Sequence, residues 1–426
     1  MKDSNKVLVI GGGGREHAII HKLKESDKVS KIYCAPGNGG ITRDAECVPI
    51  GVMEFDKLVD FAKSNEIDMV MVAPDDPLAA GAVDAFENAG IRAFGPNKRA
   101  AIIEGSKAFS KDLMKKYNIP TAKYEVFSNS VEAIGYIKEQ DTYPIVVKAD
   151  GLALGKGVII AETFEDAEKA VHEIMDDKVF GSAGGKVVIE EFLTGPEISV
   201  LAFTDGKTIK PMVSAQDHKR AFDNDKGPNT GGMGTFSPSR IYTDELADEC
   251  MKNIFIPTMN AMNSENRTFK GVLYFGLMKT PDGVKVIEYN CRFGDPETQV
   301  VLPRLESDLF EIFDAVIDER LNEIDIKWND GAAVCVVLAS GGYPRKYQTG
   351  YPIEGLCRAE SAGALIFHAG TKADGDNILT SGGRVLGVTA VASNLDDAIK
   401  TAYGYVDLIS FKDMHYRKDI GIKKYN

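Results

Sequence analysis

The stretch Val284–Gln299, VKVIEYNCRFGDPETQ, contains the features that decide the fold of this chain. Its first half is rich in β-branched residues, which predicts a strand. Side chains alternate between the two faces of a strand, so Glu288 and Asn290 are expected to share one face. Two oxygen ligands on one face suit a divalent cation such as Mg²⁺, which proteins hold with few side chains together with substrate phosphates.

The second half of the stretch adds a cation and a turn. If the strand extends by two residues, Arg292 joins the same face with a planar guanidinium that fits phosphate or carboxylate. Gly294, Asp295 and Pro296 then predict a turn with an acid at its tip. A Glu-x-Asn pair alone is more typical of a solvent-exposed strand face, so the hypothesis of a site depends on the other segments.

Length and composition exclude several classes of protein. With 426 residues the chain is long enough for about three domains. Its net charge of -13 argues against nucleic-acid binding, and it has no apolar window of membrane-spanning length. The N-terminus leads directly into a strand, which does not predict a signal peptide. Six scattered cysteines without a CxxC pair indicate a reducing compartment, so we expect a cytoplasmic enzyme with no membrane or nucleic-acid partner.

Strands alternate with helices over residues 1–103, which predicts an open parallel α/β sheet. A glycine loop at Gly11–Gly14 links an apolar strand to a helix that begins near Arg15, a geometry that places an anion at a helix N-terminus. The spacing does not match a dinucleotide fingerprint, because Glu16 or His17 occupies the position of the third glycine. We therefore interpret the loop as a phosphate site, with a tight turn that binds no ligand as the alternative.

A glycine-rich hairpin is predicted in the middle of the chain. The strand that ends at Lys148 is followed by the loop Ala149–Gly157 and by a second strand, and Lys156 lies at the other side of the loop. Glycine N–H groups can close over nucleotide phosphates while the two lysines supply charge. The P-loop signature and the other signatures of protein kinases are absent. The alternative is a mobile surface hairpin.

Three further polar segments are candidates for the site. Lys107 lies in the first turn of a predicted helix, where a cation is unfavourable unless an anion is also present. Glu190 and Glu191 end an apolar strand and could accept hydrogen bonds from a nucleoside. The loop Ser214–Arg220 carries several donors, and His218 is not required as a catalytic base. The alternatives are an ordinary surface lysine, a solvated strand edge and a solvated charged loop.

Taken together, these motifs resemble the ATP-grasp superfamily and, within it, the phosphoribosylamine–glycine ligases, over essentially the whole chain. The segments that carry the resemblance are Gly13–Ala18, Ala35–Asn38, Gly105–Lys107, Lys148–Ala153, Gly155–Val158, Gln216–Arg220, Gly227–Gly234 and Arg292–Gln299. The resemblance implies an N-terminal open parallel α/β domain (1–103), an ATP-grasp core (104–325) with a glycine-rich lid subdomain (124–193), and a small mixed α/β C-terminal domain (326–426).

The resemblance also implies an activity and a set of contacts. The family joins glycine to 5-phosphoribosylamine with ATP and Mg²⁺ or Mn²⁺ through a glycyl phosphate, in purine biosynthesis, and suggests a monomer. The implied nucleotide contacts are Lys107, Lys148, Gly151, Lys156, Gly157, Glu190, Glu191, Leu193 and Glu197, with Glu288 and Asn290 as metal ligands. The implied substrate contacts are Gly13, Gly14, Arg15, Asn38, Asp75, Asp217 and Gly294, and the catalytic residues are Lys219, Arg292 and Asp295.

Three positions depart from the family pattern. Asp75 stands where a glutamate is common, and Gly12 stands where the first loop commonly has an asparagine. The strand Tyr274–Met278 lacks the second metal-binding acid of many ATP-grasp enzymes. Two other readings compete: an ATP-grasp ligase that uses another carboxylate with a phosphoribosyl amine, and a non-catalytic nucleotide-binding or redox protein. The Asp217–Arg220 loop and the Arg292–Gln299 string argue against the first, and the failed dinucleotide spacing argues against the second.

Overall fold

The N-terminal part of the computed structural model is a parallel sheet of five strands in the order β3-β2-β1-β4-β5. The structure describes residues 4–152 and 157–422. The strands are β1 (Asn5–Gly11), β2 (Val29–Pro36), β3 (Glu46–Cys47), β4 (Met69–Val72) and β5 (Ala93–Phe94), and the helices are α1 (Gly14–Leu23), α2 (Phe55–Ser64), α3 (Asp75–Ala80) and α4 (Ala82–Asn88). Apolar side chains of β1 enter a buried core on each side of the sheet, as expected for a parallel sheet covered on both faces.

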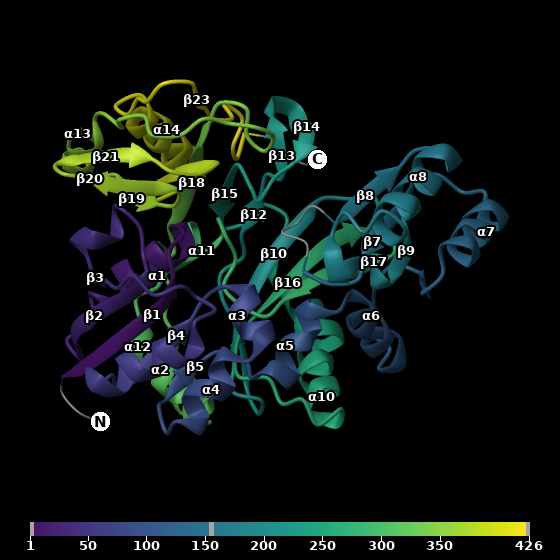
Figure 1. Cartoon of the computed structure of the whole chain (residues 1–426), viewed down its shortest axis with the longest axis horizontal. Coiled ribbons are helices and arrows are strands. Elements are labelled where there is room, and N and C mark those ends of the chain that lie inside the picture. The colour runs from purple at the N-terminus through teal and green to yellow at the C-terminus, as the bar shows by residue number, and fades with distance from the viewer. Residues whose placement is uncertain (1–3, 153–156, 423–426) are drawn as a thin grey trace.

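A second sheet, which is antiparallel, forms a separate lobe at the right of Figure 1. Helices α5 (Lys98–Gly105) and α6 (Lys107–Lys116) precede it in the chain. Its strands have the order β6-β9-β7-β8. They are β6 (Tyr124–Phe127), β7 (Ile145–Ala149), β8 (Val158–Ala161) and β9 (Val187–Glu191), and the helices are α7 (Ser130–Gln140) and α8 (Phe164–Met175). Helices α7 and α8 and one face of the sheet share a hydrophobic core that is separate from the cores of the other sheets.

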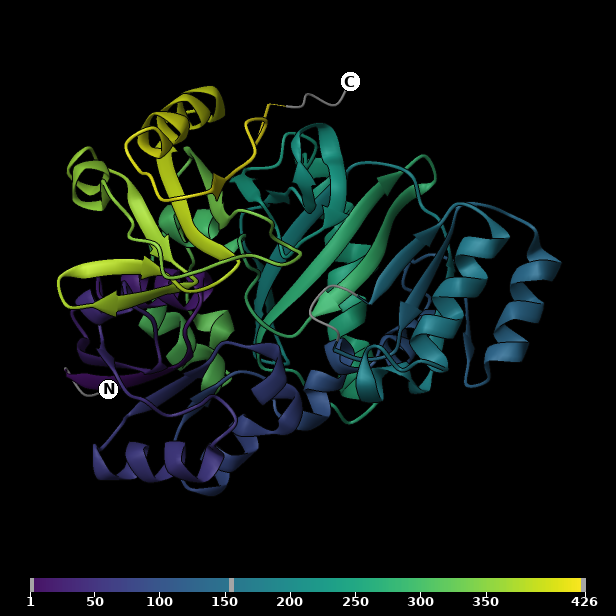
Figure 2. The ribbon, with the colours of Figure 1, turned by 45° about the horizontal axis from the view of Figure 1, so that its top comes forward.

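The central sheet carries the stretch from which the sequence analysis began. Its order is β11-β10-β16-β17. The strands are β10 (Glu197–Thr204), β11 (Ile209–Pro211), β16 (Gly271–Thr280) and β17 (Gly283–Asn290). Helices α9 (Asp244–Cys250), α10 (Ile256–Ser264) and α12 (Leu309–Ile317) lie beside this sheet, and α11 (Thr298–Val301) follows β17 in the chain. Figure 2 shows β16 and β17 running between the N-terminal part and the lid lobe.

The C-terminal sheet lies above the N-terminal part in Figure 1 and has the strand path β12-β15-β18-β22-β19, with β23 paired to β18. Its strands are β12 (Gln216–Asp217), β15 (Gly234–Ser237), β18 (Ala332–Ser340), β19 (Leu365–His368), β22 (Arg384–Ala392) and β23 (Met414–His415). Two hairpins, β13 (Arg220–Phe222) with β14 (Lys226–Asn229) and β20 (Thr371–Asp374) with β21 (Asn377–Thr380), and helices α13 (Leu356–Ser361) and α14 (Leu395–Val406) complete it.

Strands β12 and β15 precede residue 326, so this sheet takes part of its edge from the segment predicted to belong to the ATP-grasp core. The predicted fold class, a multidomain α/β protein with an N-terminal parallel sheet, is confirmed. The domain boundaries stay a prediction. Within residues 4–152 and 157–422, no helix combines the length and the apolar character that a membrane span needs.

Candidate active site

A β-bulge places the two predicted metal ligands. The register between β16 and β17 pairs Gly276 with Glu288 and Leu277 with Val286, so Ile287 is the extra residue. Strict alternation would have put Glu288 on the same side as Val286, which is buried in the core. The extra residue turns Tyr289 into the core instead, where it is 4% exposed, and leaves Glu288 and Asn290 together on the other face. The predicted shared face is confirmed, and the bulge was not foreseen.

Lysines surround the Glu288 carboxylate. The ammonium of Lys219 lies 3.5 Å from Oε1 of Glu288 and 3.1 Å from Oε2 of Glu197, and so links the two acids. Lys219, despite the opposing effect of burial, lowers the pKa of Glu288, with help from Lys148 and Lys107. Burial disfavours the charge of Lys219, but the two glutamates raise its pKa well above the usual value. Both groups are therefore charged at neutral pH.

Arg292 reaches this face from the turn that follows β17. The strand ends at Asn290, so it does not extend to Arg292, a possibility that the sequence had left open. The Arg292 guanidinium lies 3.1 Å from Oε1 of Glu104 and 4.0 Å from Asp75, and it donates to Oδ1 of Asn290 at 3.2 Å. Glu104 also accepts a hydrogen bond from the backbone N–H of Cys291 at 2.8 Å. Burial raises the pKa of Glu104, although Arg292 opposes that shift.

The C-terminal sheet contributes Arg384 to the turn around Asp295. The guanidinium of Arg384 lies 3.0 Å from Oδ2 of Asp295, donates to the Asp295 backbone carbonyl at 2.9 Å, and also donates to the carbonyl of Gly231. Gln299 donates to Oδ1 of Asp295 at 2.8 Å. Burial opposes the charge of Asp295, but Arg384 and Arg15 lower its pKa. Arg384 was not among the site residues predicted from the sequence.

A second group of acids lies near the same turn. Glu297 is 4% exposed, and the hydroxyls of Ser199 and Tyr274 each lie 3.0 Å from its Oε1. Burial, with a further contribution from Glu297, raises the pKa of Asp217 well above its usual range. A Cβ atom on Gly294 would lie 2.5 Å from Oε2 of Glu297, so any larger residue there would displace this carboxylate. Ser199, Tyr274 and Glu297 were not predicted as site residues.

The first glycine loop packs against the turn at Phe293. The backbone N–H of Gly13 donates to Oε2 of Glu16 at 2.5 Å, and Nε of Arg15 donates to Oε1 of Glu16 at 2.7 Å. Nη1 of Arg15 donates to the carbonyl of Phe293 at 3.3 Å. Gly14 is the residue after Gly13, and a Cβ atom on it would lie 2.7 Å from Nε2 of Gln299. The Glu16 carboxylate therefore occupies the helix N-terminus that was predicted to face a phosphate.

Asn38 lies in the glycine-rich segment 37–40, which follows β2, and connects this segment to the C-terminal part. Its Nδ2 donates to the carbonyls of Gly12 at 2.9 Å and of His368 at 2.7 Å. Its Oδ1 accepts from the backbone N–H groups of Gly40 at 2.9 Å and of Ile41 at 3.0 Å. These four bonds use the hydrogen-bonding capacity of the amide. The side chain of Asn38 therefore holds the loop in shape.

The glycine loop of the lid is fixed at its N-terminal end. Nζ of Lys107 donates to the carbonyl of Gly151 at 2.7 Å, and the Asp150 carboxylate accepts two hydrogen bonds of 3.0 Å from the start of α6. Burial lowers the pKa of Lys107. Gly157 closes the other end, where its carbonyl accepts from the backbone N–H of Ala149 at 2.8 Å. Lys156 lies outside the described residues.

Glu190, which was predicted to contact the nucleoside part of the nucleotide, is 4% exposed and is engaged within the protein. Its Oε1 lies 2.8 Å from Nζ of Lys148, and its Oε2 lies 2.8 Å from Nζ of Lys111. Glu191 and Leu193, further along the same segment, remain partly exposed. Lys111 was not predicted. Its position four residues after Lys107 in one helix is the only signal that indicates a shared face.

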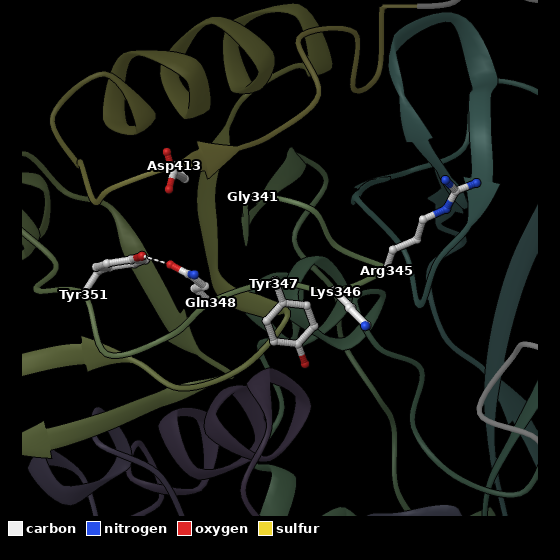
Figure 3. Close-up of a pocket in the computed structure, with 7 residues that line it drawn as sticks. All are labelled: Gly341, Arg345, Lys346, Tyr347, Gln348, Tyr351 and Asp413. Carbon is white, nitrogen blue, oxygen red and sulfur yellow. Dashed lines mark hydrogen bonds between the residues drawn. The ribbon is translucent and has the colours of Figure 1, made fainter.

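A pocket of about 770 Å³ lies elsewhere, on the C-terminal part (Figure 3). It is lined by Gly341, Arg345, Lys346, Tyr347, Gln348, Tyr351 and Asp413. None of these residues belongs to the set predicted above. The only bond drawn among them runs from the Tyr351 hydroxyl to Oε1 of Gln348 at 2.5 Å. We assign the pocket no role in the chemistry.

Family models match the chain in three consecutive segments. They describe the N domain (residues 5–104), the ATP-grasp domain (105–298) and the C domain (333–423) of phosphoribosylglycinamide synthetase. The chain belongs to the phosphoribosylglycinamide synthetase family. It is accordingly an ATP-grasp ligase, and the resemblance inferred from the sequence is confirmed.

Individual relatives of this synthetase family agree with the assignment. A phosphoribosylamine–glycine ligase from Halalkalibacterium halodurans is 51% identical over 98% of the chain and 96% of its own length. The Escherichia coli K12 enzyme of the same name is 48% identical over 98% of both chains. The crystal structure of the Thermotoga maritima enzyme has a TM-score of 0.83 and 32% sequence identity, and the match covers 98% of this chain and 100% of that one.

The donor set of the synthetase site fits a phosphate-bound cation. Among residues 4–152 and 157–422, no group of three or more His, Cys, Asp or Glu side chains is arranged to hold a metal ion. Glu288 and Asn290 lie on one face of β17, and their side chains carry hard oxygen atoms of the kind that such a cation binds. Such an incomplete set suits Mg²⁺ or a similar ion, which completes its shell with substrate phosphates and water.

Replacing Arg384 by glutamine tests the contribution of the C-terminal sheet to catalysis. The change removes the ion pair with Asp295 and the bond to Gly231, so we expect kcat/KM to fall about 30-fold, because the turn loses its position. Initial rates of ADP release measure the effect. Arg345→Gln, an exposed arginine of the same part, is the control. Equal rates for both variants would contradict a role for Arg384.

Proposed function

We propose that this ligase joins glycine to 5-phosphoribosylamine and converts ATP to ADP and phosphate, giving glycinamide ribonucleotide. The observation that carries the proposal is the position of Glu288, which lies among charges contributed by Lys219, Lys148, Lys107 and Arg292. Such an arrangement suits transfer of a phosphoryl group, for which enzymes mainly supply positioning and charge neutralisation. The names of the relatives support the choice of glycine and phosphoribosylamine.

In the first step, a carboxylate oxygen of glycine attacks the γ-phosphorus of ATP. The bond to the β-phosphate oxygen breaks, ADP leaves with the electron pair, and glycyl phosphate forms. Lys107 and Lys148 bind the nucleotide phosphates, and Arg292 stabilises the charge on the transferred group. Glu288 and Asn290 would hold a divalent cation, Mg²⁺ or Mn²⁺, which supplies further charge neutralisation when bound.

In the second step, the amine nitrogen of phosphoribosylamine attacks the acyl carbon of glycyl phosphate. The acyl C–O bond breaks, inorganic phosphate leaves, and the amine loses a proton, which the phosphate accepts. Asp217 faces the ammonium group of glycine, and Asp295, held by Arg384, orients the turn on which Arg292 lies. Lys219 connects the nucleotide and metal sides through Glu197 and Glu288.

The remaining contacts are inferred from the family resemblance. We infer that the glycines and the lysine of the lid loop cover the phosphates. The segment that follows β9, together with Glu197, contacts the nucleoside. The N-terminal glycine loops and the helix that begins at Asp75 contact phosphoribosylamine. The residues concerned are Gly151, Lys156, Gly157, Glu191, Leu193, Gly13, Gly14, Arg15, Asn38, Asp75 and Gly294. For Asn38 we infer a positioning role, because its amide is already engaged. For Glu190 we infer the role argued in the next subsection.

We further infer that the ligase works as a monomer in the cytoplasm. The family resemblance supports the monomer. The scattered free cysteines and the place of the reaction in purine biosynthesis support a reducing compartment.

Omission of single components tests the proposed reaction. Purified protein is given ATP, Mg²⁺, glycine and freshly prepared phosphoribosylamine, and ADP release is followed while each component is left out in turn. We expect release to require all four. Release that continues with another carboxylate in place of glycine would contradict the substrate assignment but not the ATP-grasp chemistry. Release that is independent of phosphoribosylamine would contradict the ligation.

A further inference from the structure

A buried ion cluster connects the body of the protein to the lid lobe beside the proposed nucleotide site. Lys111 on α6 is 2% exposed, Glu190 on β9 is 4% exposed, and Lys148 on β7 is 5% exposed. The carboxylate of Glu190 lies between the two ammonium groups, 2.8 Å from each. Charged groups so deeply buried are costly unless they are paired, so the cluster calls for a functional explanation.

The strand register fixes the geometry of the lid side. Strands β7 and β9 are antiparallel, Val146 faces Glu190, and Lys148 is therefore the diagonal neighbour of Glu190 on the same face. On the body side, Nζ of Lys111 donates to Oγ1 of Thr121 at 2.8 Å, and this hydroxyl donates to the carbonyl of Val286 at 2.7 Å. The cluster thus connects the lid strands to β17, the strand that carries Glu288.

Lys111 and Lys148 differ in how many of their ammonium N–H donors already have a partner in the protein. Lys111 binds Glu190 and Thr121, and its ammonium lies 5.8 Å from the centre of the Tyr124 ring. Among the described residues, Nζ of Lys148 contacts Oε1 of Glu190 at 2.8 Å and the backbone carbonyl of Ile287 at 3.4 Å. An ammonium has three donors, so these contacts within residues 4–152 and 157–422 leave at least one donor of Lys148 for a ligand.

We propose that Lys111 is a positioning residue for ATP, which binds one oxygen of Glu190 so that Lys148 keeps its orientation and a free donor toward the nucleotide phosphates. The inference deepens the proposed function and rests on the assignment of Lys148 to the phosphates. It also reassigns Glu190: its carboxylate orients the lysine and does not read the adenine base.

Charge balance supports this role. Two cations share one anion, so the cluster has a net positive charge that a phosphate can neutralise. If Lys111 were neutral, Lys148 would become the sole counter-ion of the buried Glu190 carboxylate. Its ammonium would then be drawn to both carboxylate oxygens, and its attraction for phosphate would weaken. The affinity for nucleotide should therefore depend on Lys111 even though Lys111 lies behind Lys148.

The same geometry predicts a pH dependence. The groups that face Lys111 are Glu190 and Glu191 on β9, Lys148 on β7 and Tyr124 on β6. Burial, which the carboxylates only partly offset, lowers the pKa of Lys111 to about 8. Above that pH the lysine loses its proton and the cluster its net charge. The apparent KM for ATP is therefore expected to rise as the pH passes through 8.

Nucleotide binding by the full chain tests the proposal independently of the ligation reaction. Isothermal titration with Mg-ADP, in the absence of glycine and phosphoribosylamine, is expected to give about tenfold weaker binding for Lys111→Met than for the unmodified protein. Lys115→Met, an exposed lysine one turn further along α6, is the matched control and should bind normally. In steady-state assays, Lys111→Met should raise the KM for ATP but leave the KM for glycine unchanged.

The conservative variant distinguishes a positioning role from a merely structural one. Lys111→Arg keeps a permanent charge, so it should restore most of the affinity and remove the rise in KM above pH 8.

Equal affinity of Lys111→Met and unmodified protein for Mg-ADP would overturn the proposal. So would a loss of kcat with no change in KM for ATP. If Lys111→Met does not fold, an unchanged pH profile of Lys111→Arg would overturn it. If the unmodified protein fails to bind Mg-ADP, the proposed function itself fails.

Discussion

Replacing Arg292 by methionine is expected to lower kcat/KM about 1,000-fold, the largest effect of any single change considered for this chain. The guanidinium donates to Oδ1 of Asn290, a predicted metal ligand, and lies 3.1 Å from the buried carboxylate of Glu104. Methionine fills a similar volume but supplies no charge. The transferred phosphoryl group then loses its proposed stabilisation, and Asn290 loses a donor that orients it.

The same variant carries a stability cost that must be measured separately. Without Arg292, the Glu104 carboxylate remains buried without its cation, which costs about 3 kcal/mol in the free energy of unfolding at pH 7. Burial raises the pKa of Glu104 in the folded state, so this carboxyl binds its proton more readily in the folded protein than in the unfolded chain. Stability of the variant should therefore rise as the pH falls from 7 to 5.

Urea unfolding at both pH values measures this cost, and kinetic assays are performed where the variant is folded. Arg99→Met, an exposed arginine on the same helix as Glu104, should change neither activity nor stability. Arg292→Lys restores charge but not the planar fork, so it should recover only part of the rate. Full activity of Arg292→Met at a pH where it is folded would contradict the assigned role.

Replacing Glu288 by glutamine is expected to lower kcat/KM about 300-fold. The amide keeps the shape of the side chain and one oxygen ligand, but it removes the negative charge. The metal ion then binds more weakly, and Lys219 loses one of its two acidic partners, the other being Glu197. The Mg²⁺ concentration for half-maximal rate should rise accordingly, and excess Mg²⁺ should recover part of the activity.

A matched control for Glu288→Gln exists on the same hairpin. Asp282→Asn makes the same acid-to-amide change at the exposed turn between β16 and β17, and it should leave the metal dependence unaltered. Titration of the rate with Mg²⁺ for the three proteins is the measurement. An unchanged Mg²⁺ requirement in Glu288→Gln would show that Glu288 does not bind the metal.

The periodicity of the sequence predicted the main elements and the shared face of Glu288 and Asn290, because strands constrain local neighbours strongly. It did not predict the extra residue Ile287. A bulge depends on the pairing partner, and here the need to bury both Val286 and Tyr289 selects it. Without the bulge, Glu288 would share the core face with Val286, and Tyr289 would point away from the core. Glu288 and Asn290 share a face in either case, because the extra residue precedes both.

The residues that sequence reasoning missed come from distant segments. Glu104 ends a helix and Arg384 begins a C-terminal strand, and each acquires a role only through tertiary contact with the Arg292–Asp295 turn. Lys111 looks like any helix lysine in the sequence. Glu190 was identified as important from its place at the end of a strand, but the structure shows its carboxylate between two lysines.

Transfer of an oxygen atom from glycine to phosphate tests the central claim most directly. Glycine labelled with ¹⁸O in its carboxylate is incubated with the ligase, ATP, Mg²⁺ and phosphoribosylamine, and the released phosphate is analysed by mass spectrometry. Formation of glycyl phosphate predicts that one labelled oxygen per turnover appears in the phosphate. Phosphate without label, formed at the same rate as ADP, would contradict the acyl phosphate mechanism and with it the assigned chemistry of the site.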